Sequence, residues 1–453
     1  MSGLGLKMYL AYNILYLIAL FILFPFEYLK RSRELRNRWL KERLGLYKTT
    51  PHYSNTPLPC IWIHAVSVGE VIASTPLIKK IKEKYTDADI IISTVTDTGQ
   101  KVAQERIGNI AKVIYVPFDI PFAINMAVKK IKPSIFIIVE TELWPNIIRI
   151  MRRNSIPVLL MNGRISEKSF NRYKIFRFFM QDVLNNINIL CMQNELYAER
   201  MRELGADPNK IKTIGNFKFD TRPSSAVPEW TGIFRRQKTE DREQTNERGF
   251  TIISGSTHRT EEDLILNAYM KLRTDFPRLN LIIAPRHPER FREVEELLKK
   301  KGLEYVKRSE LHNSWFAESS ESHRVSGLQT SYQASGIIIL LDVIGELSSV
   351  YSVCDIAIMG GSFIEHGGQN PLEPAYWGKA IVCGPHMENF PFIDEFYRTG
   401  SALKTDSDSL YESLKGLLIS PERILSMGNL AKELYEKNSG AADKAIAVIE
   451  KHL

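Results

Sequence analysis

The stretch "CIWIHAVSVGEVIASTPLIKKIKEKY", residues 60–85, holds the two patterns that decide the fold. Its first seven residues form a short apolar run rich in β-branched side chains, which predicts a buried strand. After a loop that contains Gly69, residues 71–85 have the apolar spacing of a helix. Continuous apolar strands that alternate with helical crossovers indicate a parallel sheet covered by helices on both faces.

Similar apolar runs recur in two sets along the chain. We therefore expect an α/β protein with two Rossmann-like domains that face a cleft. A length of 453 residues also favours more than one domain. The runs of the first set are 60–66, 89–96, 111–118, 134–141, 156–162, 188–194 and 210–216, and those of the second set are 250–257, 279–285, 336–342, 355–361 and 379–384.

Polar and irregular stretches separate these parts. Residues 222–249 are interpreted as a linker and residues 308–335 as an insertion in the second domain. The amphipathic pattern at 429–452 predicts a closing helix that can fold back across the first domain. The expected organisation is a membrane anchor with a basic segment (1–44), a first domain (45–221), the linker (222–249), a second domain (250–428) and a C-terminal helix (429–453).

The N-terminal segment has the composition of a membrane anchor. Residues 8–26, "MYLAYNILYLIALFILFPF", carry no charge and as a helix would span about 28 Å, close to the thickness of a bilayer core. No small-residue cleavage site follows, which disfavours a signal peptide. Seven Lys and Arg residues lie between 30 and 43, so the positive-inside rule places the rest of the chain in the cytoplasm. The alternative is an amphipathic segment that lies in the membrane interface.

Charge and cysteine content narrow the partners and the compartment. The net charge of +8 favours acidic partners such as membrane phosphates, nucleotides or nucleic acid, without choosing among them. Cys60, Cys191, Cys354 and Cys383 are scattered and lack C-x-x-C spacing. This pattern supports neither a disulfide framework nor structural zinc, and it fits a reducing compartment.

In doubly wound sheets ligands bind beyond the carboxyl ends of the strands, so residues that follow strands are the candidates for function. In the first domain, Glu70 stands at the start of a helix, as a general base or as a partner of the helix dipole. Glu140 ends a strand and Glu142 follows it; one of them can instead cap the next helix. Lys218, near the end of the first domain, can neutralise a leaving phosphate or remain solvated.

The second domain offers groups that suit an anion. Arg286 and His287 follow a strand, and Arg presents paired donors to phosphate or carboxylate; His287 has no second metal ligand at suitable spacing. Residues 254–256, "SGS", and the glycine turn at 344–347 precede further helices. In the stretch 359–374, "MGGSFIEHGGQNPLEP", glycines let backbone N–H groups approach a ligand, and Glu373 can accept ribose hydroxyls.

This layout fits a nucleotide-sugar glycosyltransferase. No G-x-x-x-x-G-K-[ST] motif is present, which disfavours ATP chemistry. The D-x-D triplets at 87–89 and 406–408 do not directly follow an expected strand, so a metal-bridged diphosphate is disfavoured as well.

Five motifs together resemble, in family order, the Kdo transferases of Gram-negative bacteria. These enzymes move 3-deoxy-D-manno-oct-2-ulosonic acid (Kdo) from CMP-Kdo onto the lipid A precursor, lipid IVA, in lipopolysaccharide biosynthesis. The resemblance covers nearly the whole chain, and the motifs are "HAVSVGE" (64–70), "ETELWPN" (140–146), "GNFKFD" (215–220), "PRHPERF" (285–291) and "GGQNPLEPA" (367–375).

The resemblance implies a role for each matching residue. Glu70 is the base that deprotonates the acceptor hydroxyl for in-line, inverting attack, while Glu140 and Lys218 stabilise or orient the transition state; Glu142 stays open as an alternative to Glu140. It also implies the GT-B architecture, no metal and no cofactor, and a site on the cytoplasmic face of the inner membrane. The segments that match the CMP-binding positions are Pro285 and Arg286, then Gly345, Glu346 and Leu347, then Asn370, Pro371, Leu372 and Glu373.

Three other functions are compatible with parts of this pattern. Another membrane-associated GT-B glycosyltransferase, with a UDP-sugar donor, would share the fold and the ribose-binding glutamate. A sugar-nucleotide epimerase would share the two domains but has no need of a membrane anchor. A non-catalytic membrane scaffold would be insensitive to the change Glu70→Gln.

Overall fold

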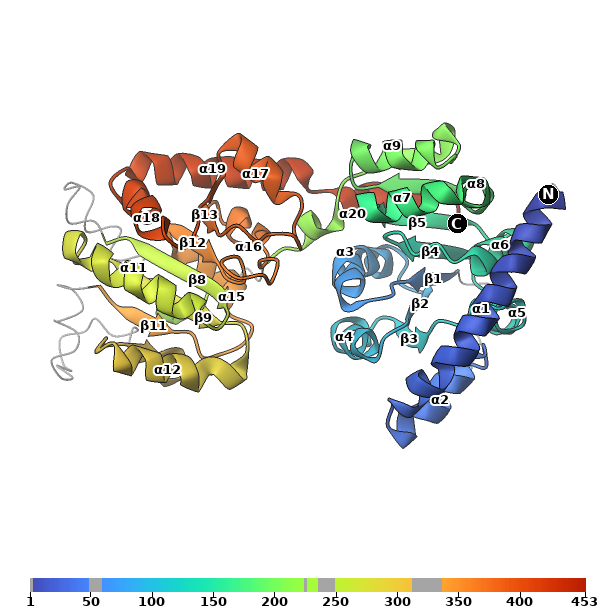
Figure 1. Cartoon of the computed structure of the whole chain (residues 1–453), viewed down its shortest axis with the longest axis horizontal. Helices are drawn as coiled ribbons and strands as arrows, with labels where there is room; N and C mark the ends of the chain where they lie inside the picture. The colour runs from blue at the N-terminus through green and yellow to red at the C-terminus, as the bar shows by residue number, and fades with distance from the viewer. Residues whose placement is uncertain (1–2, 49–58, 224–225, 235–248, 312–335) are drawn as a thin grey trace. The chain divides into compact units, whose positions relative to one another are not determined.

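A computed structural model describes residues 3–48, 59–223, 226–234, 249–311 and 336–453. The chain divides into two compact units (Figure 1). The first comprises Met1–Thr221 with Asn438–Leu453, and the second comprises Arg222–Lys437.

The first unit is built on a parallel sheet of seven strands in the order β3-β2-β1-β4-β5-β6-β7. Alternate side chains of these strands enter two separate hydrophobic clusters, so both faces of the sheet are buried, as the uninterrupted apolar runs predict. The strands are β1 (Cys60–His64), β2 (Asp89–Thr94), β3 (Lys112–Tyr115), β4 (Ile135–Val139), β5 (Val158–Gly163), β6 (Ile189–Met192) and β7 (Ile211–Thr213).

Helices cover both faces of this sheet. Side chains of α3 (Val68–Lys84), α4 (Asp97–Ile107) and α20 (Ala441–Ile449) pack in the cluster on one face. Side chains of α5 (Pro121–Ile131), α6 (Pro145–Arg153), α8 (Arg177–Asn185) and α9 (Glu195–Glu203) pack in the cluster on the other face. The remaining helices of the unit are α1 (Gly3–Leu29), α2 (Arg33–Arg43) and α7 (Glu167–Ile175).

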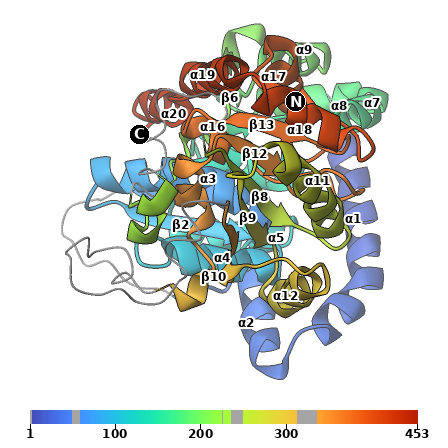
Figure 2. The same cartoon turned by 90° about the vertical axis from the view of Figure 1, so that its left-hand side faces the viewer.

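The second unit repeats this architecture with strand order β10-β11-β9-β8-β12-β13-β14, again all parallel. Its strands are β8 (Thr251–Thr257), β9 (Asn280–Pro285), β10 (Val306–Lys307), β11 (Ile338–Leu340), β12 (Ile356–Met359), β13 (Ala380–Cys383) and β14 (Ala402–Lys404). Its helices are α11 (Glu261–Asp275), α12 (Phe291–Lys300), α15 (Leu347–Val350), α16 (Leu372–Tyr376), α17 (Ile393–Thr399), α18 (Leu410–Leu418) and α19 (Pro421–Asn438). Helices α11 and α18 lie side by side in both views (Figures 1 and 2). The two α/β units expected from the sequence are thus confirmed.

Helix α1 docks one side on the first unit and leaves the other side open. The Tyr12 hydroxyl donates to Asp119 Oδ2 at 2.8 Å, and the Asp119 backbone N–H donates to the Tyr16 hydroxyl at 3.1 Å. Asn146 Nδ2 donates to Asn13 Oδ1 at 2.6 Å. Residues Lys7–Leu29 are long and apolar enough to cross a membrane. The open side exposes Leu10, Ile14, Leu15, Leu17, Ile18, Phe21, Ile22, Leu23, Phe26 and Leu29.

The C-terminal part differs from the predicted single helix over 429–452, and that prediction is wrong. Two helices, α19 and α20, are separated at Gly440, which has a φ of +90°. The Asp220 carboxylate accepts hydrogen bonds from the backbone N–H groups of Gly440 and Ala442 and so fixes the start of α20. Helix α20 packs against α3 in the first unit.

The segments interpreted as linker and insertion are partly core. Trp230 and Phe234, from residues 222–249, are fully buried in the second unit, and Leu311, from residues 308–335, packs in the same cluster. Single apolar residues within a polar stretch form no periodic pattern, so the sequence did not indicate that these residues are buried. Within these two segments, residues 224–225, 235–248 and 312–335 lie outside the described residues.

The burial of Trp230 can be tested by substitution. Its indole Nε1 donates to Glu346 Oε2 at 3.0 Å, and its ring packs edge-on against Phe234. We expect Trp230→Ala to lower the free energy of unfolding by about 3–5 kcal/mol. Urea unfolding followed by circular dichroism measures the change. The neighbouring exposed residue supplies the control, because Glu229→Ala should change stability by less than about 0.5 kcal/mol. Equal effects of the two variants would contradict the assignment of Trp230 to the core.

Candidate active site

Glu70 and Glu140 meet at the topological switch point of the first sheet. Strands β1 and β4 are neighbours, but β1 leads into α3 on one face and β4 leads toward α6 on the other. Loops that diverge in this way leave room at the carboxyl edge of the sheet, where doubly wound proteins bind ligands. Glu70 lies in the first turn of α3, and Glu140 directly follows β4.

The Glu70 carboxyl is buried and held by its own helix start. Val66 N–H donates to Glu70 Oε2 at 2.6 Å, and the Ser67 hydroxyl donates to Oε1 at 3.0 Å. Burial raises the pKa of Glu70 to about 8, and the negative charges of Glu142 and Glu140 act in the same direction. Burial therefore outweighs the helix dipole, which by itself lowers the pKa of a carboxyl at the start of a helix. A carboxylate with such a pKa is suited to accept a proton near neutral pH.

Glu140 is held in a backbone conformation that is unfavourable for a side chain. Its φ is +59°, in the left-handed region. Its N–H donates to Met161 O at 2.9 Å, and its carboxylate accepts a hydrogen bond from Arg164 Nε at 2.8 Å. Strain of this kind costs about 1–3 kcal/mol and persists where the surroundings impose it, often at functional sites.

Lys218 lies next to this pair. Burial lowers the pKa of Lys218, while the charge of Glu140 raises it and that of Arg164 lowers it. The turn that carries it, η2 (Phe217–Asp220), is fixed because the Asn162 side-chain oxygen accepts from Phe217 N–H at 3.0 Å. The structure thus brings the predicted residues Glu70, Glu140 and Lys218 to one edge of one sheet.

Neither Glu140 nor Glu142 caps α6, which was the structural alternative for both. The Asp119 carboxylate accepts the N–H groups of Asn146 and Ile147 at 3.1 and 2.9 Å instead. Glu142 accepts from Trp144 Nε1 at 3.1 Å. The sequence analysis did not select Arg164 and Asn162. Both stand at the end of a predicted strand, and this position could have identified them as candidates.

The predicted nucleotide-binding residues gather at the corresponding edge of the second sheet. Gly255 allows the Tyr351 side chain to approach the backbone of β8, because a Cβ atom at this position would lie 1.8 Å from the Tyr351 hydroxyl. Burial raises the pKa of Glu373, against the opposing effects of a hydrogen bond with the Asn370 side chain and the charge of Arg286. The side chain of Glu373 therefore lies close to those of Asn370 and Arg286. The short helix α16 starts beside them, at Pro371 and Leu372. Pro285 ends β9 immediately before Arg286.

The glycine turn at Gly345 is braced by a partly buried network of side chains. Arg308 donates to both oxygens of Glu346, at 2.8 and 2.9 Å, and Trp230 donates to one of them. The Glu346 side chain is thus engaged within the chain. Gly345 itself is exposed with a φ of +94°, and the Leu347 side chain lies near Gly255.

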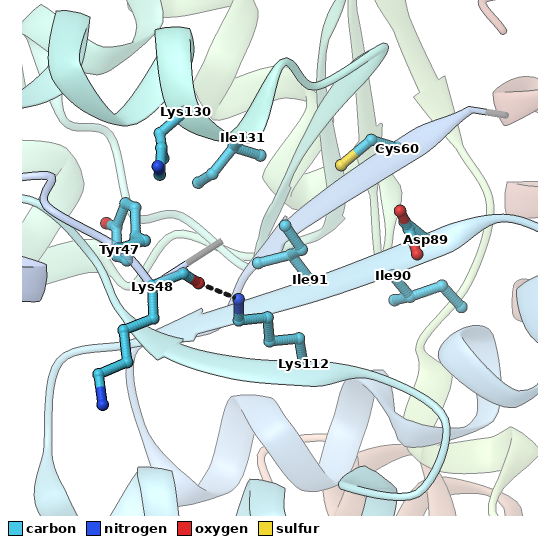
Figure 3. Close-up of a pocket in the computed structure, with 9 residues that line it drawn as sticks. All are labelled: Tyr47, Lys48, Cys60, Asp89, Ile90, Ile91, Lys112, Lys130 and Ile131. Carbon is cyan, nitrogen blue, oxygen red and sulfur yellow. Dashed lines mark hydrogen bonds between the residues drawn. The ribbon is translucent and has the colours of Figure 1, made fainter. Parts of the chain in front are cut away.

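A separate pocket in the first unit lies away from Glu70 and Glu140. It is a small cavity of about 80 Å³, and the Lys112 ammonium donates to Lys48 O at 2.6 Å beside it (Figure 3). Cys60, Asp89 and Lys112 each begin a strand, so this pocket lies at the amino edge of the sheet, opposite Glu70 and Glu140. Among the described residues no group of three or more His, Cys, Asp or Glu side chains is placed to hold a metal ion.

Solved structures define the class by fold. MurG from Acinetobacter baumannii matches with a TM-score of 0.52 and 12% identity, covering 87% of this chain and 100% of that chain. UDP-GlcNAc 2-epimerase from Neisseria meningitidis bound to UDP-GlcNAc matches with a TM-score of 0.53 and 12% identity, over 87% and 100% of the two chains. The protein is therefore a two-unit, doubly wound α/β protein with GT-B-like architecture.

Sequence comparison identifies the family. A model of the 3-deoxy-D-manno-octulosonic-acid transferase (kdotransferase) domain matches residues 38–221. The 3-deoxy-D-manno-octulosonic acid transferase of Haemophilus influenzae is 33% identical over 428 residues, which cover 93% of each chain. That of Bordetella pertussis is 26% identical, over 93% of this chain and 94% of its own. The chain belongs to the family of 3-deoxy-D-manno-octulosonic acid transferases, glycosyltransferases that transfer Kdo in lipopolysaccharide biosynthesis.

The strain at Glu140 separates function from stability. Glycine adopts a φ of +59° without strain, so Glu140→Gly should stabilise the fold by about 1 kcal/mol. The ion pair with Arg164 that is lost contributes little stability, because Arg164 is half-exposed. We expect Glu140→Gly to be at least as stable as the wild type while Kdo transfer falls at least tenfold. Thermal unfolding and a transfer assay measure the two effects. Glu167→Gly, at an exposed helix start, is the control and should retain activity. A variant that is destabilised and still active would contradict a functional role for Glu140.

Proposed function

We propose that the protein transfers Kdo from CMP-Kdo to a hydroxyl of the lipid A precursor, an acylated and phosphorylated disaccharide, with inversion at the anomeric carbon. The observation that carries this proposal is the buried Glu70 carboxyl at the switch point of the first sheet, with a pKa of about 8. A base with this pKa is half ionised at about pH 8, keeps an ionised fraction at neutral pH and is basic enough to take a hydroxyl proton.

In this proposal, Glu70 removes the acceptor hydroxyl proton as the oxygen forms a bond to the anomeric carbon. The bond from that carbon to the CMP phosphate breaks at the same time, and CMP leaves as an anion. The ammonium of Lys218, beside Glu140, supplies positive charge for groups that become negative in this step. Glu140 orients Lys218 and is itself held by Arg164.

The second unit supplies the proposed donor site. Arg286 binds the phosphate, and Glu373 accepts the ribose hydroxyls, supported by the neighbouring side chain of Asn370. Backbone groups of Pro285, Gly345, Leu347, Pro371 and Leu372 complete the contacts, with Glu346 in a bracing role. A single phosphate leaving group can be neutralised by these cationic groups, and we propose that transfer needs no metal ion.

The base is tested by a conservative change. Glu70→Gln keeps the size of the side chain and removes its basicity, so we expect Kdo transfer to fall by about 10²–10⁴-fold. The detergent-solubilised protein is given tetra-acylated lipid A precursor and CMP-Kdo that is generated in the reaction mixture. Mass spectrometry of the lipid product then measures transfer. Glu167→Gln, also in the first turn of a helix, is the matched control. Chelation with EDTA should leave the wild-type rate unchanged.

The same assay has a second readout in pH. Because the pKa of Glu70 is raised to about 8, the ionised fraction falls tenfold per unit below that pH. The kcat/KM for the acceptor, at saturating donor, should therefore rise up to pH 8 and level off above it. Full activity of Glu70→Gln would indicate that Glu142 or Glu140, and not Glu70, acts as the base. A wild type that binds UMP in preference to CMP would favour a UDP-sugar donor.

We propose further that the protein is bound to the cytoplasmic face of the inner membrane through α1. One side of α1 is held by Asp119 and Asn146, and the other side exposes ten large apolar side chains. This arrangement favours a helix lying in the interface, and the basic helix α2 suits anionic head groups. The acceptor, an acylated lipid, is found at the same surface.

Membrane attachment can be tested on the open side of α1. Replacing Ile18, Phe21 and Phe26 by Gln removes apolar area without touching the docked side, so we expect binding to vesicles with anionic lipid to fall at least tenfold. Co-flotation of the protein with vesicles measures binding. Leu425→Gln, at an exposed position of the second unit, is the control and should float as the wild type does. Undiminished flotation of the triple variant would exclude α1 as the anchor.

A further inference from the structure

Three histidines far apart in the sequence meet at the carboxyl edge of the second sheet. His258 follows β8, His287 follows β9 and His366 follows β12, and these three strands are adjacent. The ring centroids of His258 and His366 are 4.1 Å apart, and those of His258 and His287 are 5.8 Å apart. His258 is 8% exposed, whereas His287 and His366 are exposed to solvent.

The central imidazole is buried with its polar atoms unsatisfied. Within the described part of the chain, neither ring nitrogen of His258 makes a hydrogen bond of good geometry, although the Ser256 backbone lies close enough to raise its pKa. Its Nδ1 lies 3.8 Å from Glu261 Oε2, beyond hydrogen-bond distance. A buried polar atom without a partner costs about 1–3 kcal/mol, so a ligand that supplies the partner would remove that cost.

The surroundings hold this cluster in place. The Glu261 carboxylate accepts the backbone N–H groups of His258, Gly361 and Phe363, at 2.8, 2.7 and 3.0 Å. Gly361, with a φ of +67°, adjoins both rings, since a Cβ atom there would lie 3.3 Å from His366 and 3.5 Å from His258. One buried carboxylate thus fixes the loops that present two of the histidines.

We propose that His258, His287 and His366 form an anion site that binds an acidic oxygen group of the sugar-nucleotide donor, either its phosphate or the carboxylate of its sugar. The site extends the proposed function and rests on it. Imidazole N–H groups donate to such oxygens, and the bond becomes stronger when the ring carries a proton. Nothing in the nucleotide-binding assignment above gives these three residues a role.

Binding at this site should be coupled to proton uptake. Burial lowers the pKa of His258 to about 4, and the positive charges that His366, His287 and Arg290 can carry act in the same direction, against the nearby Ser256 backbone. Glu261 is the acidic group that faces the ring. His258 is therefore neutral at pH 7, and an anion that binds beside it raises its proton affinity.

The experiment is calorimetry on the detergent-solubilised full chain with CMP and with cytidine, at pH 7, in buffers of different ionisation enthalpy. We expect wild type to take up protons when it binds CMP. His287→Ala and His366→Ala, both at exposed positions, should weaken CMP binding by about tenfold or more and reduce this uptake, with cytidine unaffected. His452→Ala, in the first unit, is the matched control.

The outcomes separate the two anions and the two proposals. If the variants bind CMP normally but the KM for CMP-Kdo rises about tenfold, the site binds the carboxylate of the sugar. If CMP binding, its proton uptake and the KM for CMP-Kdo all match the wild type, the anion site is overturned while the donor assignment stands. If the wild type binds neither CMP nor CMP-Kdo, the proposed function fails and this inference with it.

Discussion

The structure depends on the burial of both faces of two parallel sheets. Because each strand is covered above and below by apolar side chains, its interior positions cannot hold charged groups without large desolvation costs. Polar chemistry is therefore confined to the residues that follow the strands. The loops diverge at the switch points, between β1 and β4 in one unit and between β8 and β12 in the other, and the proposed catalytic and donor groups lie there.

Much of this arrangement follows from local sequence. Uninterrupted apolar runs predict the parallel strands, and Glu70, Glu140, Arg286 and Glu373 were found by asking which polar residues follow them. The exposed and docked sides of α1 could not be predicted, because its apolar residues lie all round the helix. The polar docking contacts of Tyr12, Asn13 and Tyr16 depend on partners that are distant in the sequence. The break at Gly440 was likewise hidden in a continuous amphipathic pattern.

The histidine cluster shows a different limit of sequence reasoning. His258, His287 and His366 are separated by 29 and 79 residues, and no spacing rule for a ligand site links them. Strand order brings them together, since β9, β8 and β12 are neighbours although β12 follows β9 only after two other strands. Predicting a parallel sheet is possible from periodicity, whereas predicting which strands are adjacent requires the packing of the whole unit.

The same position in the two units carries a buried glutamate with different surroundings. Glu70 and Glu261 both stand in the first turn of the helix after the first strand of their sheet. Burial raises the pKa of Glu261, and the hydrogen bonds from three backbone N–H groups oppose that rise while they tie the loops together. Burial raises the pKa of Glu70 to about 8; one N–H group and one hydroxyl oppose this rise, and the charges of Glu142 and Glu140 add to it. The two buried glutamates thus differ in what they hold: Glu261 joins separate loops, whereas Glu70 bonds only to its own helix start and is the one we propose for proton transfer.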